Sequence, residues 1–271
     1  MIRRFVTLFG FAMLLSTAAV AKPAEAVPVA DKTAPAEGLD IYLLIGQSNM
    51  AGRAKVTADL AGPIDHAYLL NDKREWVPAK NPLNLYSTIR KGEGMQKLGP
   101  GYRFAVEMLQ ANPKTRIGLV VNARGGSKIE QWERGAKYYK ELLERAEQAK
   151  QAGTLKGVLW HQGESNSNKP EAYLDQLKAL IANLREDLGD RKLPFVAGQV
   201  TNTPPLKIND VIGGLPEAVP NTAAVSSEGL RCYDRWHFDT KSQLELGKRY
   251  AKAMLELQAA IEADQADDAS N

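Results

Sequence analysis

Short apolar runs alternate along this chain with longer amphipathic stretches, and this alternation limits the possible folds more than any other feature. Five runs are too short for helices and show little polar–apolar alternation, which is typical of strands covered on both faces: residues 41–45, 117–121, 157–160, 194–200 and 223–227. Four stretches have helical spacing: residues 102–113, 136–153, 170–189 and 240–263. Because parallel neighbours need crossover connections, this order predicts an α/β fold, a three-layer α/β/α sandwich with a central, mainly parallel sheet.

Both ends of the chain are predicted to lie outside this domain. Residues 1–21 combine a short basic opening with an apolar stretch that ends in small residues, which is typical of a secretory signal peptide. A membrane anchor is the alternative, but the apolar stretch is short for one. Residues 22–38 are rich in Ala, Pro and charge and indicate a flexible linker. One domain over residues 39–263 remains, and the acidic tail 264–271 is predicted to be disordered.

The charge and cysteine content narrow the class of protein further. The chain has 35 basic and 32 acidic residues, and the net charge falls to +1 without Arg3 and Arg4 of the predicted signal. A nearly neutral chain without a long basic run gives no footprint for a nucleic-acid partner. The single cysteine, Cys232, excludes an intramolecular disulfide and is expected to be a small buried side chain. We therefore expect a secreted or periplasmic protein with no stable membrane anchor after signal cleavage.

Four of the predicted strands run into loops rich in Gly, Ser, Asn, Gln, Asp, Glu and His. Ligands of parallel α/β sheets bind beyond the carboxyl ends of the strands. These loops are therefore expected to converge on one edge of the sheet; they contain GQSNMAGR, NARGGSKIEQW, HQGESN and EGLRCYDRWHF. Residues 52–100 contain few clear elements and are expected to form an excursion over that edge.

A serine, a histidine and an aspartate in these loops have the chemistry for nucleophilic catalysis. A serine hydroxyl needs a nearby base, usually a histidine oriented by a carboxylate. Of the three histidines, His66 lies in PIDHAYLL without a polar constellation around it and is assigned to the surface or a loop, whereas His161 and His237 lie in strand-end loops. Asp234 precedes His237 by three residues, so Ser48, His237 and Asp234 form the simplest triad. The alternatives are that the Asp-x-x-His pair only braces its loop and that Ser48 is a turn or helix-cap residue.

Acyl transfer also needs donors for the negative charge that develops on the carbonyl oxygen. The candidates are the backbone amide of Ser48, an amide in the Gly125-Gly126 turn and the side-chain amide of Gln162. The two glycines could instead only permit a tight turn, and Gln162 could only satisfy buried backbone groups.

Taken together, GQSNMAGR, NARGGSKIEQW, WHQGESN and DRWHF resemble the ordered sequence blocks of the SGNH hydrolase superfamily. The similarity is to the branch that holds sialate O-acetylesterase-like proteins and acetylxylan esterases, which are carbohydrate acetylesterases, and it spans residues 46–238. The resemblance implies a flavodoxin-like SGNH hydrolase fold and a serine esterase without metal or cofactor. It implies that Ser48 is the nucleophile, His237 the base and Asp234 its orienting acid.

The same resemblance assigns the oxyanion donors. Gly125 or Gly126 of the second block would supply one backbone amide. Gln162 matches the side-chain donor of the third block, where many members of the superfamily have asparagine. Position 50 is Met, so the loop lacks the Gly-x-Ser-x-Gly elbow, which argues against the α/β-hydrolase family.

Further residues are expected to bind the substrate. Glu164 is a second carboxylate that could partner His237 or shape the sugar site. Gln47 and Asn49, the neighbours of the serine, are expected to line the site. Trp132 and Trp236 are expected to line the acyl-sugar cleft, whereas Trp160 is assigned to the core.

Two other classes of site compete with the esterase. A metal site of His161, Glu164 and His237 lacks any paired ligand motif such as His-x-x-x-His. A non-catalytic carbohydrate-binding module would use the tryptophans as stacking platforms but leaves Ser48 unexplained. The sequence therefore predicts an exported serine esterase that removes O-acetyl groups from xylan, sialic acid or another acetylated glycan.

Overall fold

The computed structural model describes residues 37–201 and 206–270. The predicted signal peptide and most of the predicted linker lie outside the described residues. The strands of the described part are β1 (Leu39–Gly46), β2 (Pro63–Leu70), β3 (Trp76–Lys80), β4 (Ile117–Ala123), β5 (Gly153–His161), β6 (Phe195–Gly198) and β7 (Thr222–Val225). The α-helices are α1 (Ser48–Ala51), α2 (Gly101–Ala111), α3 (Lys137–Lys150), α4 (Pro170–Leu188), α5 (Ile208–Gly213), α6 (Leu215–Ala218) and α7 (Thr240–Ser270).

The strands form one sheet in the order β3-β2-β4-β1-β5-β6-β7. All neighbours are parallel except β2 and β3, which are antiparallel. The mainly parallel sheet that the sequence predicted is confirmed. The first strand, β1, lies between β4 and β5. The strand order therefore runs outward from β1 in opposite directions, with β2 to β4 on one side and β5 to β7 on the other. Ligand sites of open α/β sheets form where the strand order reverses in this way.

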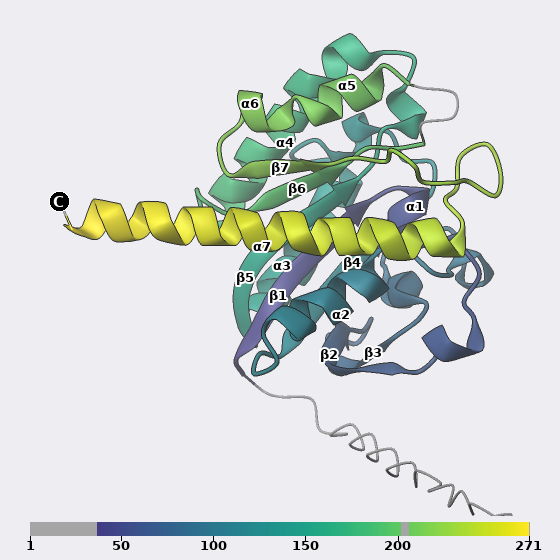
Figure 1. Cartoon of the computed structure of the whole chain (residues 1–271), viewed down its shortest axis with the longest axis horizontal. Helices are drawn as coiled ribbons and strands as arrows, with labels where there is room; N and C mark the ends of the chain where they lie inside the picture. The colour runs from purple at the N-terminus through teal and green to yellow at the C-terminus, as the bar shows by residue number, and fades with distance from the viewer. Residues whose placement is uncertain (1–36, 202–205, 271) are drawn as a thin grey trace, which may run out of the picture.

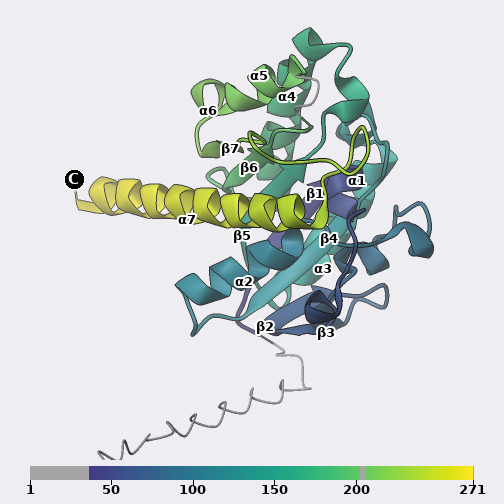
Figure 2. The same ribbon diagram turned by 45° about the vertical axis from the view of Figure 1, so that its right-hand side comes forward.

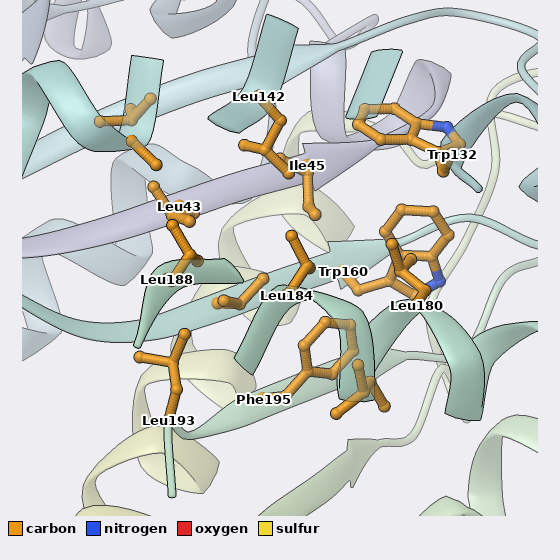
Figure 3. Packing of buried hydrophobic residues seen from close by; sticks show 14 of the residues in the cluster. Leu43, Ile45, Trp132, Leu142, Trp160, Leu180, Leu184, Leu188, Leu193 and Phe195 are labelled. Atoms are coloured by element: carbon orange, nitrogen blue, oxygen red, sulfur yellow. The ribbon is translucent and has the colours of Figure 1, made fainter. Parts of the chain in front are cut away.

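The side chains of β1 pack on both faces of the sheet, and Figure 3 shows the packing on one of them. Leu43 and Ile45 pack into one core cluster with residues of α3 and α4, such as Leu142 and Leu184. Leu44 points to the opposite face and belongs to a second cluster with residues of α2 and α7. Successive strand residues point to opposite faces, so a strand buried on both sides reads as one apolar run.

The helices form the two outer layers (Figure 1). Helices α2 and α7 contact each other over one face of the sheet, and α3 and α4 cover the other. Helix α4 begins with Pro170 in its first turn and ends at Gly189, whose φ of 77° is left-handed. Both features agree with the predicted ends of this helix, because proline suits the first turn and glycine the residue after the last one.

Two sequence predictions differ from the structure. Within residues 52–100, β2 and β3 form a hairpin that extends the sheet at one edge. This hairpin escaped prediction because His66 and Pro78 interrupt its strands; His66 itself is exposed, as predicted. Residues 264–271 were predicted to be disordered, but those that the structure describes, 264–270, continue α7, whose last turns extend past the sheet (Figure 2). Extending an existing helix costs far less than nucleating one, and Ala and Gln are favourable helix residues.

None of the described helices combines the length and the apolar character that a membrane span requires.

Candidate active site

The three central strands end level with one another. Gly46, the last residue of β1, is paired with Ala123 of β4 and with His161 of β5. Its φ is 133°, and a Cβ at this position would lie 2.2 Å from the carbonyl oxygen of His161. Only glycine therefore fits here, and the chain can turn at once into Gln47 and α1. Ser48 is the first residue of that short helix, between the loops that follow β4 and β5.

Ser48, His237 and Asp234 form a continuous hydrogen-bonded relay. The Nε2 atom of His237 lies 3.0 Å from Ser48 Oγ, and its Nδ1 atom lies 2.8 Å from Asp234 Oδ2. A carboxylate can only accept hydrogen bonds, so Nδ1 carries the proton and Nε2 is free to accept the serine hydroxyl. The structure thus brings together the three residues that the sequence singled out.

Asp234 also braces its own loop. Its Oδ1 atom accepts the backbone amides of Trp236, at 2.8 Å, and His237, at 2.7 Å. Burial alone would raise the pKa of Asp234, but the hydrogen bonds from His237 and from these two amides lower it below its ordinary value. The carboxylate therefore stays ionised beside the imidazole. The brace and the relay, which were alternatives from the sequence, occur together.

The relay opens into a cavity of about 400 Å³. The loops after β1, β4 and β5, the 229–239 loop and the 52–100 segment all contribute to its walls. The lining residues are Gln47, Ser48, Arg53, Lys91, Met95, Gly125, Gly126, Glu164, Ser165, Trp236 and His237. This volume lies in the usual range for small-ligand pockets. The strand-end loops therefore converge, as the sequence predicted.

The Gly125-Gly126 turn lies against the serine. A Cβ on Gly125 would come within 3.7 Å of Ser48 Cβ, and Gly126 has a φ of 73°. A hydrogen bond from the Ser127 amide to the Arg124 carbonyl closes the turn. Among the described residues, neither glycine amide donates a hydrogen bond, so both remain available to a ligand in the cavity.

Gln162 does not reach the cavity, contrary to the prediction that its side chain is an oxyanion donor. It is fully buried, and its Nε2 atom donates to the carbonyl of Ser127, at 3.1 Å, and to Oδ1 of Asn166, at 2.7 Å. A side-chain amide has two N–H groups, and both are used here. Gln162 therefore ties the loop after β4 to the loop after β5, which is the structural alternative that the sequence left open.

Glu164 lines the cavity without touching His237. Its Oε1 atom accepts a hydrogen bond of 2.7 Å from Nδ2 of Asn49. Burial raises the pKa of Glu164 to about 7, although this hydrogen bond acts in the opposite direction. The partner of His237 is thus Asp234, the first of the two carboxylates considered from the sequence.

Asn49 supports the site from the protein interior and does not line the cavity. The side chain is fully buried, and Nδ2 also donates to the carbonyl of Trp236, at 2.9 Å. Its Oδ1 atom accepts the Phe238 amide, at 3.1 Å, and Nε2 of Gln243, at 3.0 Å. The prediction of a substrate contact at Asn49 is therefore wrong, because every polar atom of this side chain is used between loops.

The neighbouring Gln47 does line the cavity, as predicted. Its Oε1 atom accepts the backbone amides of Gly163, at 3.3 Å, and Ser165, at 3.4 Å. These bonds tie the loop after β1 to the loop after β5.

The two tryptophans expected at the cleft have different positions. Trp236 is half-buried and lines the cavity, with the guanidinium of Arg235 4.6 Å above its ring. Trp132 is fully buried in the core, where its Nε1 atom donates to Ser127 Oγ and its ring packs edge-on against Trp160. The prediction for Trp132 is wrong, since the residue faces inward from the 3-10 helix Ile129–Trp132. Trp160 is a core residue, as predicted.

Arg53, Lys91, Met95 and Ser165 line the cavity but were not singled out from the sequence. The buried guanidinium of Arg53 donates from Nη1 to the carbonyls of Gly52, at 2.7 Å, and Met95, at 2.8 Å. Burial lowers the pKa of this guanidinium. Arg53 ends the quoted GQSNMAGR segment, so its position was a usable signal, whereas Lys91 and Met95 lie where the sequence showed few elements.

The residues of the rejected metal hypothesis are not assembled into a centre. His161 is buried, its Nδ1 atom lies 3.0 Å from the hydroxyl of Tyr250, and burial lowers its pKa to about 3. Across the described ranges, no three His, Cys, Asp or Glu side chains are grouped so that they could hold a metal ion.

Comparison with known proteins places this arrangement in a family. The family model described as "carbohydrate esterase, sialic acid-specific acetylesterase" matches residues 38–256. An Arabidopsis thaliana protein named "probable carbohydrate esterase At4g34215" is 32% identical over 238 residues, which is 79% of this chain and 90% of that protein. The X-ray structure of that protein has a TM-score of 0.74 at 30% identity, covering 82% of this chain and 99% of its own.

More distant structures share the fold. NanS has a TM-score of 0.67 at 14% identity, with 84% of this chain and 100% of its own covered. A carbohydrate acetylesterase of Xanthomonas citri has a TM-score of 0.60 at 22% identity, with 82% of this chain and 57% of its own covered. These likenesses agree with the SGNH-type fold that the sequence resemblance implied. The chain therefore belongs to the carbohydrate esterase family of sialic acid-specific acetylesterases.

Proposed function

We propose that this protein is a serine O-acetylesterase that removes acetyl groups from a carbohydrate. The observation that carries the proposal is the relay from Asp234 through His237 to Ser48 at the wall of an open cavity. A nucleophile bonded to a base that a third group orients is the arrangement that activates a serine hydroxyl.

In the proposed reaction, Ser48 Oγ attacks the ester carbonyl while His237 Nε2 takes its proton. Asp234 holds the imidazole in the tautomer that leaves Nε2 unprotonated and stabilises the imidazolium that forms. His237 then returns the proton to the oxygen of the leaving sugar alcohol, and the acetyl group remains on Ser48. Water, deprotonated by His237, hydrolyses the acetyl-enzyme and releases acetate.

The developing negative charge would be stabilised by backbone amides. The Ser48 amide lies in the first turn of α1, where amides have no acceptor within the helix. Gly125 lies against Ser48, and both Gly125 and Gly126 line the same cavity as the serine. Fixed donors of this kind are already oriented before the reaction, which is why each can supply a large part of the rate enhancement.

The acetyl and sugar specificity follows from the family and from the cavity. The matching family is described as acetylesterases of carbohydrates. The cavity of about 400 Å³ holds more than an acetyl group, and Trp236 supplies an apolar wall for a sugar ring. An acetylated xylan, sialic acid or other glycan is the proposed substrate.

Hydrolysis of 4-nitrophenyl acetate by the purified protein tests this proposal, with Ser48→Ala alongside and a chelator present. We expect turnover that survives the chelator and is lost in the variant. Equal rates in both proteins, or no turnover in either, would contradict the proposal and favour a non-catalytic carbohydrate-binding module. Acetate release from acetylated glycans then identifies the sugar.

Export is proposed on the residues of the amino-terminus alone. Residues 1–21 have the basic and apolar parts of a secretory signal and end in Ala19-Val20-Ala21. Expression of the full chain in a Gram-negative bacterium should yield a periplasmic or extracellular protein whose first residue is Lys22. A product that keeps Met1 in the cytoplasm would contradict it.

A further inference from the structure

A second cavity, of about 550 Å³, is lined in part by the two ends of the loop that carries Asp234 and His237. We call it the basic groove, since five cationic side chains line it: Arg103, Arg231, Lys241, Lys248 and Arg249. Leu230 and Leu244 add apolar surface. The chain as a whole is almost neutral, so this is a local concentration of positive charge.

The basic groove has five cationic and two acidic side chains, Asp239 and Glu245, so its lining keeps a net charge of +3. Asp239 Oδ1 accepts the amide of Ser242 and caps the first turn of α7. Glu245 pairs with Arg249 at 3.0 Å, and Arg103 pairs with Glu107, which lies one helical turn along α2. The excess positive charge is therefore not balanced within the groove.

Three cations of the basic groove have no carboxylate within ion-pair distance among the described residues: Arg231, Lys241 and Lys248. All three are exposed. Like charges that converge on one cavity repel each other, and an anionic ligand relieves that repulsion.

The groove wall is fixed by the backbone. The amide of Arg231 donates to Ser242 Oγ at 2.7 Å, and its carbonyl accepts the amide of Asp239 at 2.9 Å. The backbones of Cys232 and Phe238, the next residues along the loop, form an isolated antiparallel β-bridge. Residues 229–231 and 239 thus face the basic groove, and Trp236 and His237 of the same loop face the active-site cavity.

We propose that the basic groove binds a carboxylated polysaccharide and that the glycan runs from there over the loop to Ser48. Arg231, Lys241 and Lys248 would pair with the carboxylates, and Leu230 and Leu244 would contact the C–H faces of the sugar rings. Binding of the polymer is independent of turnover. Only the claim that this polymer carries the acetyl ester rests on the proposed function.

The test uses the full mature protein with Ser48→Ala, so that binding is measured without turnover. The probes are polygalacturonate, the same polymer fully methyl-esterified, and dextran sulfate, each in affinity gel electrophoresis and calorimetry. One variant combines Arg231→Gln, Lys241→Gln and Lys248→Gln. A control with the same charge change combines Lys114→Gln, Lys140→Gln and Arg191→Gln, which lie outside the basic groove.

We expect polygalacturonate to bind and the esterified polymer to bind at least about tenfold more weakly, with affinity falling as salt rises. The groove variant should lose about tenfold in affinity for polygalacturonate, whereas the control should keep it. With Ser48 restored, the groove variant should keep the turnover of 4-nitrophenyl acetate.

Equal affinity in the groove variant and the control would overturn the site. Dextran sulfate binding as tightly as polygalacturonate would overturn the carboxylated class. A failure of the esterase itself would change none of these binding results.

Discussion

The carboxylate of Glu164 bonds to the side chain of Asn49, 2.7 Å away, and not to the imidazole of His237. Asn49 in turn holds the carbonyl of Trp236 and the amide of Phe238, which flank that histidine. Glu164 therefore supports the position of His237 through Asn49, whereas Asp234 is the carboxylate that bonds directly to its ring. The two carboxylates near the serine have different physical surroundings, so their substitutions should have different effects.

We predict that Asp234→Asn lowers kcat/KM by about 10³- to 10⁴-fold, because an amide in place of the carboxylate favours the wrong tautomer of His237. Glu164→Gln should cost no more than about tenfold, since its oxygen can still accept the hydrogen bond from Asn49. Steady-state hydrolysis of 4-nitrophenyl acetate measures both, with Ser48→Ala as the inactive reference. Similar losses in the two variants would make Glu164 an equal partner in the chemistry.

The raised pKa of Glu164 predicts a pH dependence of stability. Its folded-state pKa of about 7 lies above the usual 4.5, so the native state binds more protons than the unfolded state between these values. The contribution of protonated Glu164 to folding stability is complete below about pH 4.5 and is lost as the pH rises through about 7. Between about pH 4.5 and pH 7, the unfolding free energy of the wild type should therefore fall by about 3 kcal/mol relative to that of Glu164→Gln.

Denaturant unfolding at pH 4.5, 5.5, 6.5 and 7.5 measures this difference. Asp187→Asn, which removes the carboxylate of an exposed ion pair with Arg134, serves as the control. Parallel pH profiles for the wild type and Glu164→Gln would show that Glu164 titrates normally.

The sheet and the relay could be predicted because local pattern determines them. A run such as residues 41–45 has one physical solution, a strand buried on both faces, and parallel strands bring the loops at their carboxyl ends together. Asp234 and His237 lie in one loop, three residues apart, so their contact is local as well.

The errors concern side chains whose partners come mainly from other loops and helices. The sequence places Gln162 and Asn49 in the correct loops, but it does not show that Ser127, Asn166 or Gln243 would use their polar atoms. Trp132 was expected at the cleft and is the last residue of the second block, yet the 3-10 helix that ends there turns the indole into the core. Contacts with residues distant in sequence decide whether a side chain lines the cavity or lies in the core.

The contrasting positions of Trp132 and Trp236 give a further prediction. Trp132→Ala should lower the free energy of unfolding by about 3–5 kcal/mol, because it opens a cavity in a fully buried cluster. Trp236→Ala should change that free energy by less than about 1 kcal/mol but raise KM for an acetylated oligosaccharide, since the ring of Trp236 lines the cavity and that of Trp132 does not. Chemical denaturation and steady-state kinetics on the same two proteins separate the effects, and a large stability loss in Trp236→Ala would place that ring in the core.

Asn49 gives the last prediction, because its side chain joins α1 to the His237 loop and to α7. Asn49→Ala removes the donor to Glu164 and the acceptor of Phe238 and Gln243, so buried polar groups lose their partners. We expect a loss of about 2–4 kcal/mol in unfolding free energy, as each unsatisfied buried group costs about 1–3 kcal/mol. We also expect a fall in kcat at unchanged KM, because the bond from Ser48 to His237 loses its support while the cavity walls remain. Gln47→Ala, which removes two longer hydrogen bonds from the adjacent position, is the matched comparison. If Asn49→Ala kept the kcat of the wild type, the His237 loop would be held in place by Asp234 and its own backbone alone.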